Sequence, residues 1–270
     1  MTAFNDACRA LAAGECRATF PAACMSPVST PPAVMSLKLA GFLDPAYQCK
    51  PFLAVTPQTS PQPSDALRDR DRIHGVIRGM AAGSMASPRS IVRPDGPLQS
   101  LSLARAVPSP RSPADITFVE AHGPGTQQGD PAGLVSICAV IVNRQPSNHL
   151  AIGSAKGNIG HSEAAAPSAS SRPSLYPRVH PQTFFHSSLP NLQLSHFFNQ
   201  HPIRISDSKQ EWTAAHRIAV VSNFGATRYA GCMVTEASPL RAIAGPLSFM
   251  ISAKDRPGRS PPSPSATPTG

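Results

Sequence analysis

The chain has 270 residues, of which 31 are prolines and 14% are charged, and its formal net charge is +9. This length suits one large domain or two small ones, whereas so many prolines and so few charges predict that parts of the chain are poorly structured. The arginines between residues 65 and 78 are interleaved with aspartates and lack neighbouring aromatic residues, which argues against nucleic-acid binding.

The six cysteines and nine histidines give no sign of a metal site. No two cysteines form a C-x-x-C pair, and no two histidines have the H-x-x-x-H spacing of a zinc site. The sequence also lacks a signal peptide and a long apolar run. We therefore expect a cytoplasmic protein with reduced thiols, no bound metal and no membrane segment.

The first predicted element is a helix over residues 3–13, in which Phe4, Cys8 and Leu11 recur at helical spacing. Gly14 is expected to end this helix.

Two glycine-rich motifs each follow a predicted strand. A strand at 117–119 leads into the run FVEAHGPGT at 118–126, which presents His122. A strand at 151–152 leads into GSAKGNIGH at 153–161, in which Lys156 lies five residues before His161. Either motif alone is a weak signal, but the two together are specific.

A helix is predicted after each motif. Asp130 is the expected N-cap and Pro131 the first helical residue of a helix that reaches residue 140. The second helix is expected over 161–166. Pro167 and the serine-rich run behind it are predicted to end that helix, because an interior proline costs about 3 kcal/mol and the run has no apolar periodicity.

The two motifs resemble the HGTGT and K-x-N-I-G-H motifs of β-ketoacyl synthases, the condensing domains of polyketide and fatty-acid synthases. Further stretches resemble the same family, in the style of fungal non-reducing iterative synthases: 7–16, 40–52, 64–79, 189–191, 219–226, 232–237 and 249–255. The resemblance implies an α/β protein with a layered α/β/α thiolase-like fold, here incomplete and comprising the C-terminal half and part of the N-terminal half.

This resemblance also implies a domain layout. Residues 1–240 would form a partial ketosynthase domain that is poorly matched at 53–63, where a core strand is missing, and at 167–188, where a helix is missing. Residues 241–255 would begin the linker toward an acyltransferase domain. The Pro- and Ser-rich residues 256–270 are expected to be disordered.

The site residues follow from the same resemblance. His122 and His161 would bind the carbonyl of a malonyl thioester and promote its decarboxylation, and Lys156 would fix the geometry around the second histidine. The substrate-binding residues implied by the resemblance are Thr126, Asn158 and Phe224. The chain itself is expected to bind no cofactor, since the substrates are carried on the phosphopantetheine of an acyl carrier protein.

A nucleophilic cysteine is the missing part, because the resemblance begins just after its position and Cys8 lies within the helix that follows it. Three hypotheses remain. The favoured one is a fragment of a polyketide synthase ketosynthase, inactive alone and marginally folded. The second is a subunit of a split, dimerising ketosynthase whose cysteine lies on another chain. The third is an acyl-thioester binder or malonyl decarboxylase, which needs the histidines but no thiol.

Overall fold

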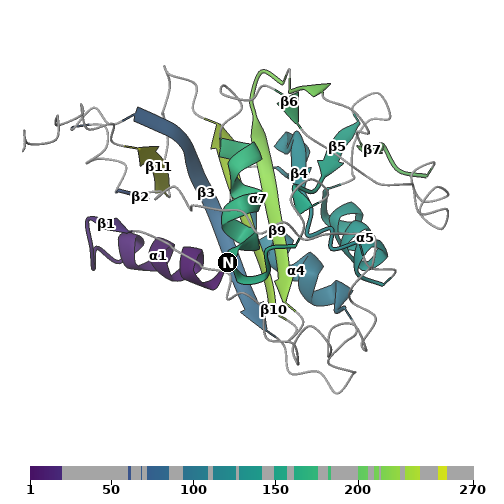
Figure 1. The fold of residues 1–270 in the computed structure, drawn as a ribbon, viewed down its shortest axis with the longest axis horizontal. Coiled ribbons are helices and arrows are strands. Elements are labelled where there is room, and N and C mark those ends of the chain that lie inside the picture. Colours follow the sequence, from purple (N-terminus) through teal and green to yellow (C-terminus); the bar gives the residue numbers. More distant parts are fainter. Residues whose placement is uncertain are drawn as a thin grey trace, which may run out of the picture.

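A seven-stranded sheet forms the centre of the structure, which is a computed structural model (Figure 1). The described residues are 1–19, 60–61, 68, 72–84, 94–108, 112–125, 128–141, 149–156, 161–175, 182–183, 200–205, 210–212, 214–225, 229–237 and 249–253. The sheet has the strand order β11-β3-β10-β9-β4-β5-β7.

The strands of this sheet are β3 (Arg72–Ser84), β4 (Phe118–Glu120), β5 (Leu150–Gly153), β7 (Ile203–Ile205), β9 (Ile218–Gly225), β10 (Tyr229–Ala237) and β11 (Phe249–Ala253). Two small antiparallel pairs lie outside it: β1 (Ala18–Thr19) with β2 (Ser60–Pro61), and β6 (Gln182–Thr183) with β8 (Gln210–Glu211). Strand β4 runs parallel to both β5 and β9, whereas β3, β10 and β11 pair antiparallel. The carboxyl ends of β4, β5 and β9 therefore meet at one edge.

Helices cover both faces of the sheet. They are α1 (Thr2–Ala12), α4 (Gly96–Ala106), α5 (Gly129–Ile141) and α7 (Ala166–Leu175), with short 3-10 helices η1 (Pro113–Asp115) and η2 (Glu163–Ala165). Because side chains alternate along a strand, neighbouring residues of β9 face opposite layers. Val220 packs in the cluster with α4 and α5, whereas Val221 packs with α1. The layered α/β/α architecture is confirmed.

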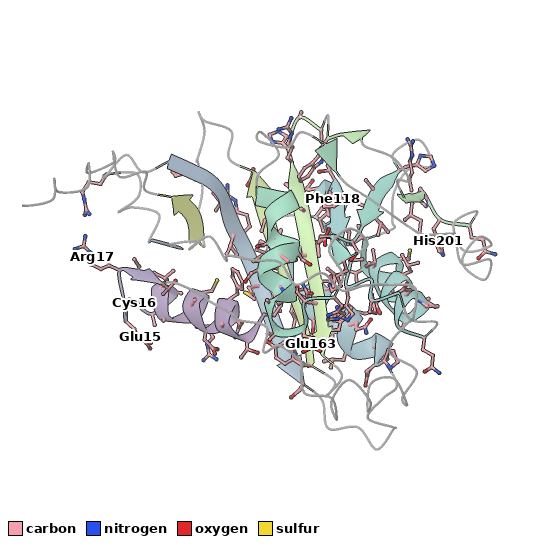
Figure 2. The ribbon with its side chains drawn as sticks, in the orientation of Figure 1. Glu15, Cys16, Arg17, Phe118, Glu163 and His201 are labelled. Atoms are coloured by element: carbon pink, nitrogen blue, oxygen red, sulfur yellow. The ribbon has the colours of Figure 1, made fainter. Side chains whose placement is uncertain are left out.

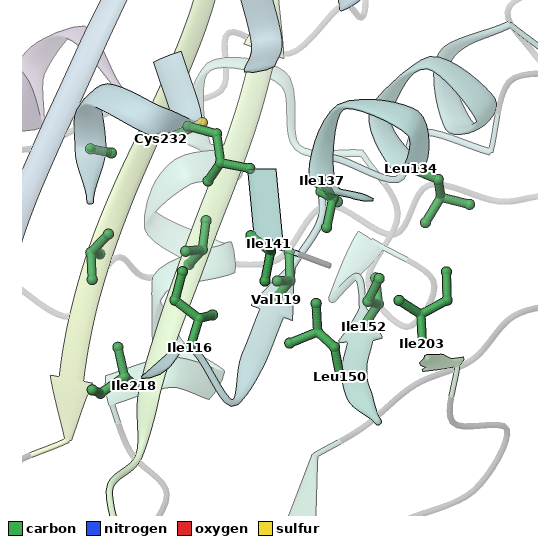
Figure 3. Close-up of a cluster of buried hydrophobic side chains, with 14 residues drawn as sticks. Ile116, Val119, Leu134, Ile137, Ile141, Leu150, Ile152, Ile203, Ile218 and Cys232 are labelled. Atoms are coloured by element: carbon green, nitrogen blue, oxygen red, sulfur yellow. The ribbon is translucent and has the colours of Figure 1, made fainter. Parts of the chain in front are cut away.

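The larger core cluster fills the space between the sheet and helices α4 and α5 (Figure 3). Its branched aliphatic side chains come from both layers, and Leu150, Ile141 and Val220 have no exposed surface. Completely burying one such side chain contributes roughly 1.5–3 kcal/mol, so this layer anchors the strands on which the histidine motifs depend.

The predicted N-terminal helix is confirmed, with Phe4, Cys8 and Leu11 buried against the sheet. Gly14 has a φ of +72°, which lies in the left-handed region that glycine adopts without strain. The predicted strands at 117–119 and 151–152 appear as β4 and β5. Of the stretches that resemble the family, residues 219–225 lie in β9 and 232–237 lie in β10.

The prediction that Pro167 ends the helix is wrong, because α7 runs from Ala166 to Leu175. Pro167 lies in the first turn of α7, where a backbone N–H has no acceptor within the helix. The lack of an N–H in proline therefore removes no helical hydrogen bond there. Serines do not interrupt the helix: the Ser171 hydroxyl donates to the carbonyl of Ser168 at 2.8 Å. Ser170 and Ser171 are almost fully buried, and α7 packs on β9, β10 and β4.

The helix after the first motif forms as expected, but Asp130 is not its N-cap. Helix α5 begins at Gly129, and the Asp130 carboxylate instead accepts a hydrogen bond from the Gly125 N–H at 3.2 Å. Residues 249–253, assigned to a linker in the sequence, form β11 and pair with β3. No helix within the described ranges is long and apolar enough to cross a membrane.

Several expectations fall outside the described residues. These are the resembling stretches at 40–52 and 189–191, the proposed loss of a strand at 53–63 except for residues 60–61, residues 64–71 of the stretch at 64–79 apart from Arg68, and the tail at 256–270. Residues 60–61 form β2.

Gly79 on β3 provides a test of this packing. A Cβ at Gly79 would collide with the carbonyl oxygen of Ala106 at the end of α4, which is backbone and cannot rotate away. We expect Gly79→Ala to lower the free energy of unfolding by about 1–3 kcal/mol, measured by urea denaturation. The matched control is Gly83→Ala on the same strand, whose Cβ meets nothing within 4 Å. Equal effects of the two substitutions would contradict the close approach of α4.

Candidate active site

The sheet edge described above brings the motif residues together. Strand β4 ends at Glu120 and leads to His122, while β5 ends at Gly153 and leads to Lys156. Strand β9, which pairs with β4, carries Asn223 near its end. Because parallel strands end at the same edge, residues distant in sequence converge there.

His122 lies between a second imidazole and an aromatic ring. Its ring centroid is 5.4 Å from that of His161, in an edge-to-face arrangement, and 5.4 Å from that of Phe224. The backbone N–H of Phe224 donates to His122 Nδ1 at 3.3 Å. Since Nδ1 is an acceptor here, a neutral His122 carries its proton on Nε2.

His161 has the same tautomer for a similar reason. The backbone N–H of Glu163 donates to His161 Nδ1 at 2.9 Å. Glu163 has a φ of 44°, an uncommon value for a residue other than glycine. Figure 2 shows Glu163 beside the N-terminal end of α7. Both histidines therefore have Nε2–H available as a donor.

The two motif loops are in close contact at Gly123. This glycine has a φ of +45°, and a Cβ there would lie 2.6 Å from the Cβ of Ser154. The Ser154 hydroxyl donates to the carbonyl of His122 at 3.4 Å. Only glycine fits this position, so the loop of the first histidine rests directly on the loop that leads to Lys156.

Both imidazoles are neutral at physiological pH. Burial, the Lys156 charge and His161 lower the pKa of His122 to about 3, although the nearby Asn223 side chain opposes the shift. Burial and the Lys156 charge lower the pKa of His161 to about 4, against a small opposing contribution from its own backbone.

Lys156 is 7% exposed, and its Nζ donates to Asn223 Oδ1 at 3.1 Å. Burial lowers the pKa of Lys156 to about 8, while the carboxylates of Glu120 and Asp130 oppose this shift. The bond from Lys156 fixes the orientation of the Asn223 amide, because an ammonium can only donate. Asn223 Nδ2 is buried and has no hydrogen-bond partner among the described residues.

Glu120, at the start of the first motif, is a buried carboxyl group. It is 1% exposed, and its Oε1 accepts a hydrogen bond from the backbone N–H of Ala155 at 2.7 Å. Burial raises the pKa of Glu120 to about 7, opposed by the Ala155 N–H, the Lys156 charge and the nearby Ser170 hydroxyl. The sequence does contain a sign of this role, because Glu120 is a charged residue in an otherwise apolar strand. Charged side chains are rarely buried without a partner.

Burial suppresses the reactivity of three of the four described thiols. Burial raises the pKa of Cys8, Cys138 and Cys232 to about 12, so these groups are protonated and weakly nucleophilic at neutral pH. Cys8 lies inside α1, as the sequence predicted.

The structure thus brings together four of the six predicted site residues, His122, His161, Lys156 and Phe224. Thr126 and Asn158 lie outside the described residues. Sequence reasoning missed Glu120 and Asn223.

Comparison with known proteins gives a consistent result. The family described as "Beta-ketoacyl synthase, C-terminal domain" matches residues 74–175. Atrochrysone carboxylic acid synthase PKS4 of Calonarius odorifer is 47% identical over 95% of this chain, and orsellinic acid synthase ArmB of Armillaria ostoyae is 35% identical over 87%. The matched regions cover 17% and 11% of those relatives, so this chain spans a small part of their length.

Solved structures show the same similarity. The ketosynthase from module 6 of the bacillaene synthase of Bacillus subtilis 168 superposes with a TM-score of 0.74 at 29% identity, covering 87% of this chain and 45% of that one. The oxazolomycin ketosynthase domain OzmH KS7 of Streptomyces albus JA3453 gives a TM-score of 0.76 at 27% identity, covering 88% and 44%.

A substitution can test whether the positive charge of Lys156 lowers the pKa values of the two histidines. Protonating an imidazole beside an ammonium group is unfavourable, so Lys156→Met should raise the pKa of His122 and His161 by roughly one unit toward 6.5. The measurement is an imidazole NMR titration of the full chain. Arg105→Met, which removes an exposed cation from α4, should leave both values unchanged. Unchanged values in Lys156→Met would contradict this electrostatic arrangement.

Proposed function

We propose that this chain, which belongs to the β-ketoacyl synthase family, acts at the malonyl half of ketosynthase chemistry. Its histidine pair binds a malonyl thioester and promotes loss of carbon dioxide. The complete reaction of the family's condensing domains is a decarboxylative Claisen condensation of acyl and malonyl thioesters. The proposal assigns one part of that reaction to the residues that the structure describes.

The observation that carries the proposal is the pair of neutral imidazoles. His122 and His161 lie with ring centroids 5.4 Å apart, and hydrogen bonds to both Nδ1 atoms leave Nε2–H as the donor of each ring. Two such donors can bind one carbonyl oxygen. They stabilise negative charge on it more strongly than on the ground-state carbonyl, which is the requirement for catalysis.

The bond changes follow from the chemistry of a malonyl thioester. The bond between the carboxylate carbon and the α-carbon breaks, and carbon dioxide leaves. The electron pair moves into the α-carbon and the thioester carbonyl, giving an enolate whose oxygen the Nε2–H groups of His122 and His161 hold. The α-carbon of the enolate then takes a proton from solvent water, which leaves hydroxide, and this gives the acetyl thioester. No thiol takes part in these steps.

Lys156 supports this half-reaction through its charge. The ammonium group holds both histidine pKa values down, so the rings stay neutral and retain a fixed donor pattern. Its charge also favours the nearby accumulation of negative charge in the enolate.

The acyl half of the reaction needs a thiolate. Burial raises the pKa of three of the four described cysteines to about 12, and the fourth, Cys16, packs against the cluster formed with α1. We therefore retain the split ketosynthase as the arrangement in which this chain would complete a condensation. The substrate would arrive on the phosphopantetheine of an acyl carrier protein, and residues 241–255 would lead toward an acyltransferase domain.

Carbon dioxide release from malonyl-coenzyme A tests the proposal, because this thioester contains the phosphopantetheine arm. The full chain should convert carboxyl-labelled malonyl-coenzyme A to labelled carbon dioxide and acetyl-coenzyme A. His122→Ala and His161→Ala should each lower the rate by roughly 100-fold or more, because each removes one donor to the enolate oxygen.

His149→Ala is the matched control, since His149 is exposed and precedes β5, at the opposite end of that strand from the edge where the motif residues meet. It should leave the rate unchanged. A rate for the full chain equal to the uncatalysed blank, or equal rates for all three histidine variants, would refute the proposed function.

A further inference from the structure

Beneath the two histidines lies a buried polar chain that the motifs do not explain. We propose that Glu120 is a positioning residue for this site: its carboxylate holds the loop that carries Lys156 and provides the counter-charge that keeps Lys156 an ammonium ion. The functional meaning of this role rests on the proposed decarboxylation, since it acts through Lys156 on the histidines.

The first part of the role is geometric. Glu120 is the last residue of β4, and its Oε1 accepts from the backbone N–H of Ala155 at 2.7 Å. Ala155 is the residue immediately before Lys156. The carboxylate therefore ties the strand of the first histidine to the loop after β5, and a charge-assisted bond of this kind is stronger than a neutral one.

The second part of the role is electrostatic. Lys156 is 7% exposed and donates to a neutral amide, Asn223 Oδ1, so its hydrogen bond brings no opposite charge. A buried ammonium without a counter-charge loses its proton. Of the two carboxylates that act on Lys156, Glu120 has the larger effect and Asp130 the smaller.

Every element packed around Glu120 and Lys156 contributes a polar or titratable side chain. Strand β4 and its loop supply Glu120 and His122, while the loop after β5 supplies Lys156. The remaining neighbours are Asp130 of α5, His161 before η2, Ser170 of α7 and Asn223 of β9. Glu120 is the only one of them that is both fully buried and able to carry negative charge.

The chain of effects reaches the reacting groups in two steps. Glu120 favours the charged form of Lys156, and the charge of Lys156 lowers the pKa of His122 and of His161. The Asn223 amide accepts a hydrogen bond from the same ammonium, and its side chain also acts on the pKa of His122. Glu120 thus influences the histidines without contacting substrate.

Glu120→Gln separates the two parts of the role. Glutamine keeps an oxygen that can accept from Ala155 but removes the negative charge. In the full chain, the NMR titration of the Lys156 ε-carbon should shift its midpoint downward by about one unit or more, because the charged lysine loses its counter-charge. Glu163→Gln, the same substitution at an exposed glutamate near the site, should not move it.

The unsubstituted chain provides a second measurement that does not depend on a variant's folding. Two coupled groups share their titration steps, so the Lys156 ε-carbon and the Glu120 carboxyl carbon should each show an inflection at the other's midpoint. Independent curves, or an unchanged Lys156 midpoint in Glu120→Gln, would overturn the proposal.

These readouts are distinct from the assay of the proposed function. If the full chain releases no carbon dioxide but the Lys156 midpoint shifts as expected, the positioning role of Glu120 stands and the proposed function fails. If carbon dioxide is released but the midpoint does not shift, the positioning role fails and the decarboxylation stands.

Discussion

Parallel pairing of β4 with β5 and β9 is the constraint on which the site depends. Each strand ends at the same edge, so three loops far apart in sequence reach one place. The apolar layer beneath, formed with α4 and α5, fixes the strands. Loop residues are then held by local contacts, such as the bond from the Phe224 N–H to His122. Rigid strands with short loops hold reacting groups more precisely than long loops would.

Desolvation gives this edge its chemical character. Burial lowers the pKa of His122, His161 and Lys156 and raises that of Glu120, so each group is shifted toward its neutral form. Opposite charges on the lysine and the glutamate counteract this tendency in each other. The result is a site with neutral rings next to a retained cation. Charge changes in the buried pair are therefore expected to act on the rings, since a low-dielectric interior screens the interaction weakly.

Much of this site could be predicted from the sequence because its chemistry is concentrated in two short motifs. His122, Lys156 and His161 lie in glycine-rich runs after apolar strands, and both features are visible without coordinates. Glu120 and Asn223 were not predicted, because their roles come from burial and from contacts between separate strands. The prediction at Pro167 was wrong for another reason. The free-energy cost of a proline depends on its position in the helix, and the first turn tolerates proline.

The contact between Gly123 and Ser154 has a consequence for how this family segment can vary. The two positions lie on different loops, yet a side chain at the first would occupy the space of the second. The φ of +45° strains any other residue at position 123 whatever the size of its neighbour, so variation of this contact is expected at position 154 alone. A mutant library for altering these two loops should therefore keep Gly123 fixed and vary Ser154, because a non-glycine residue at 123 is strained beside any partner.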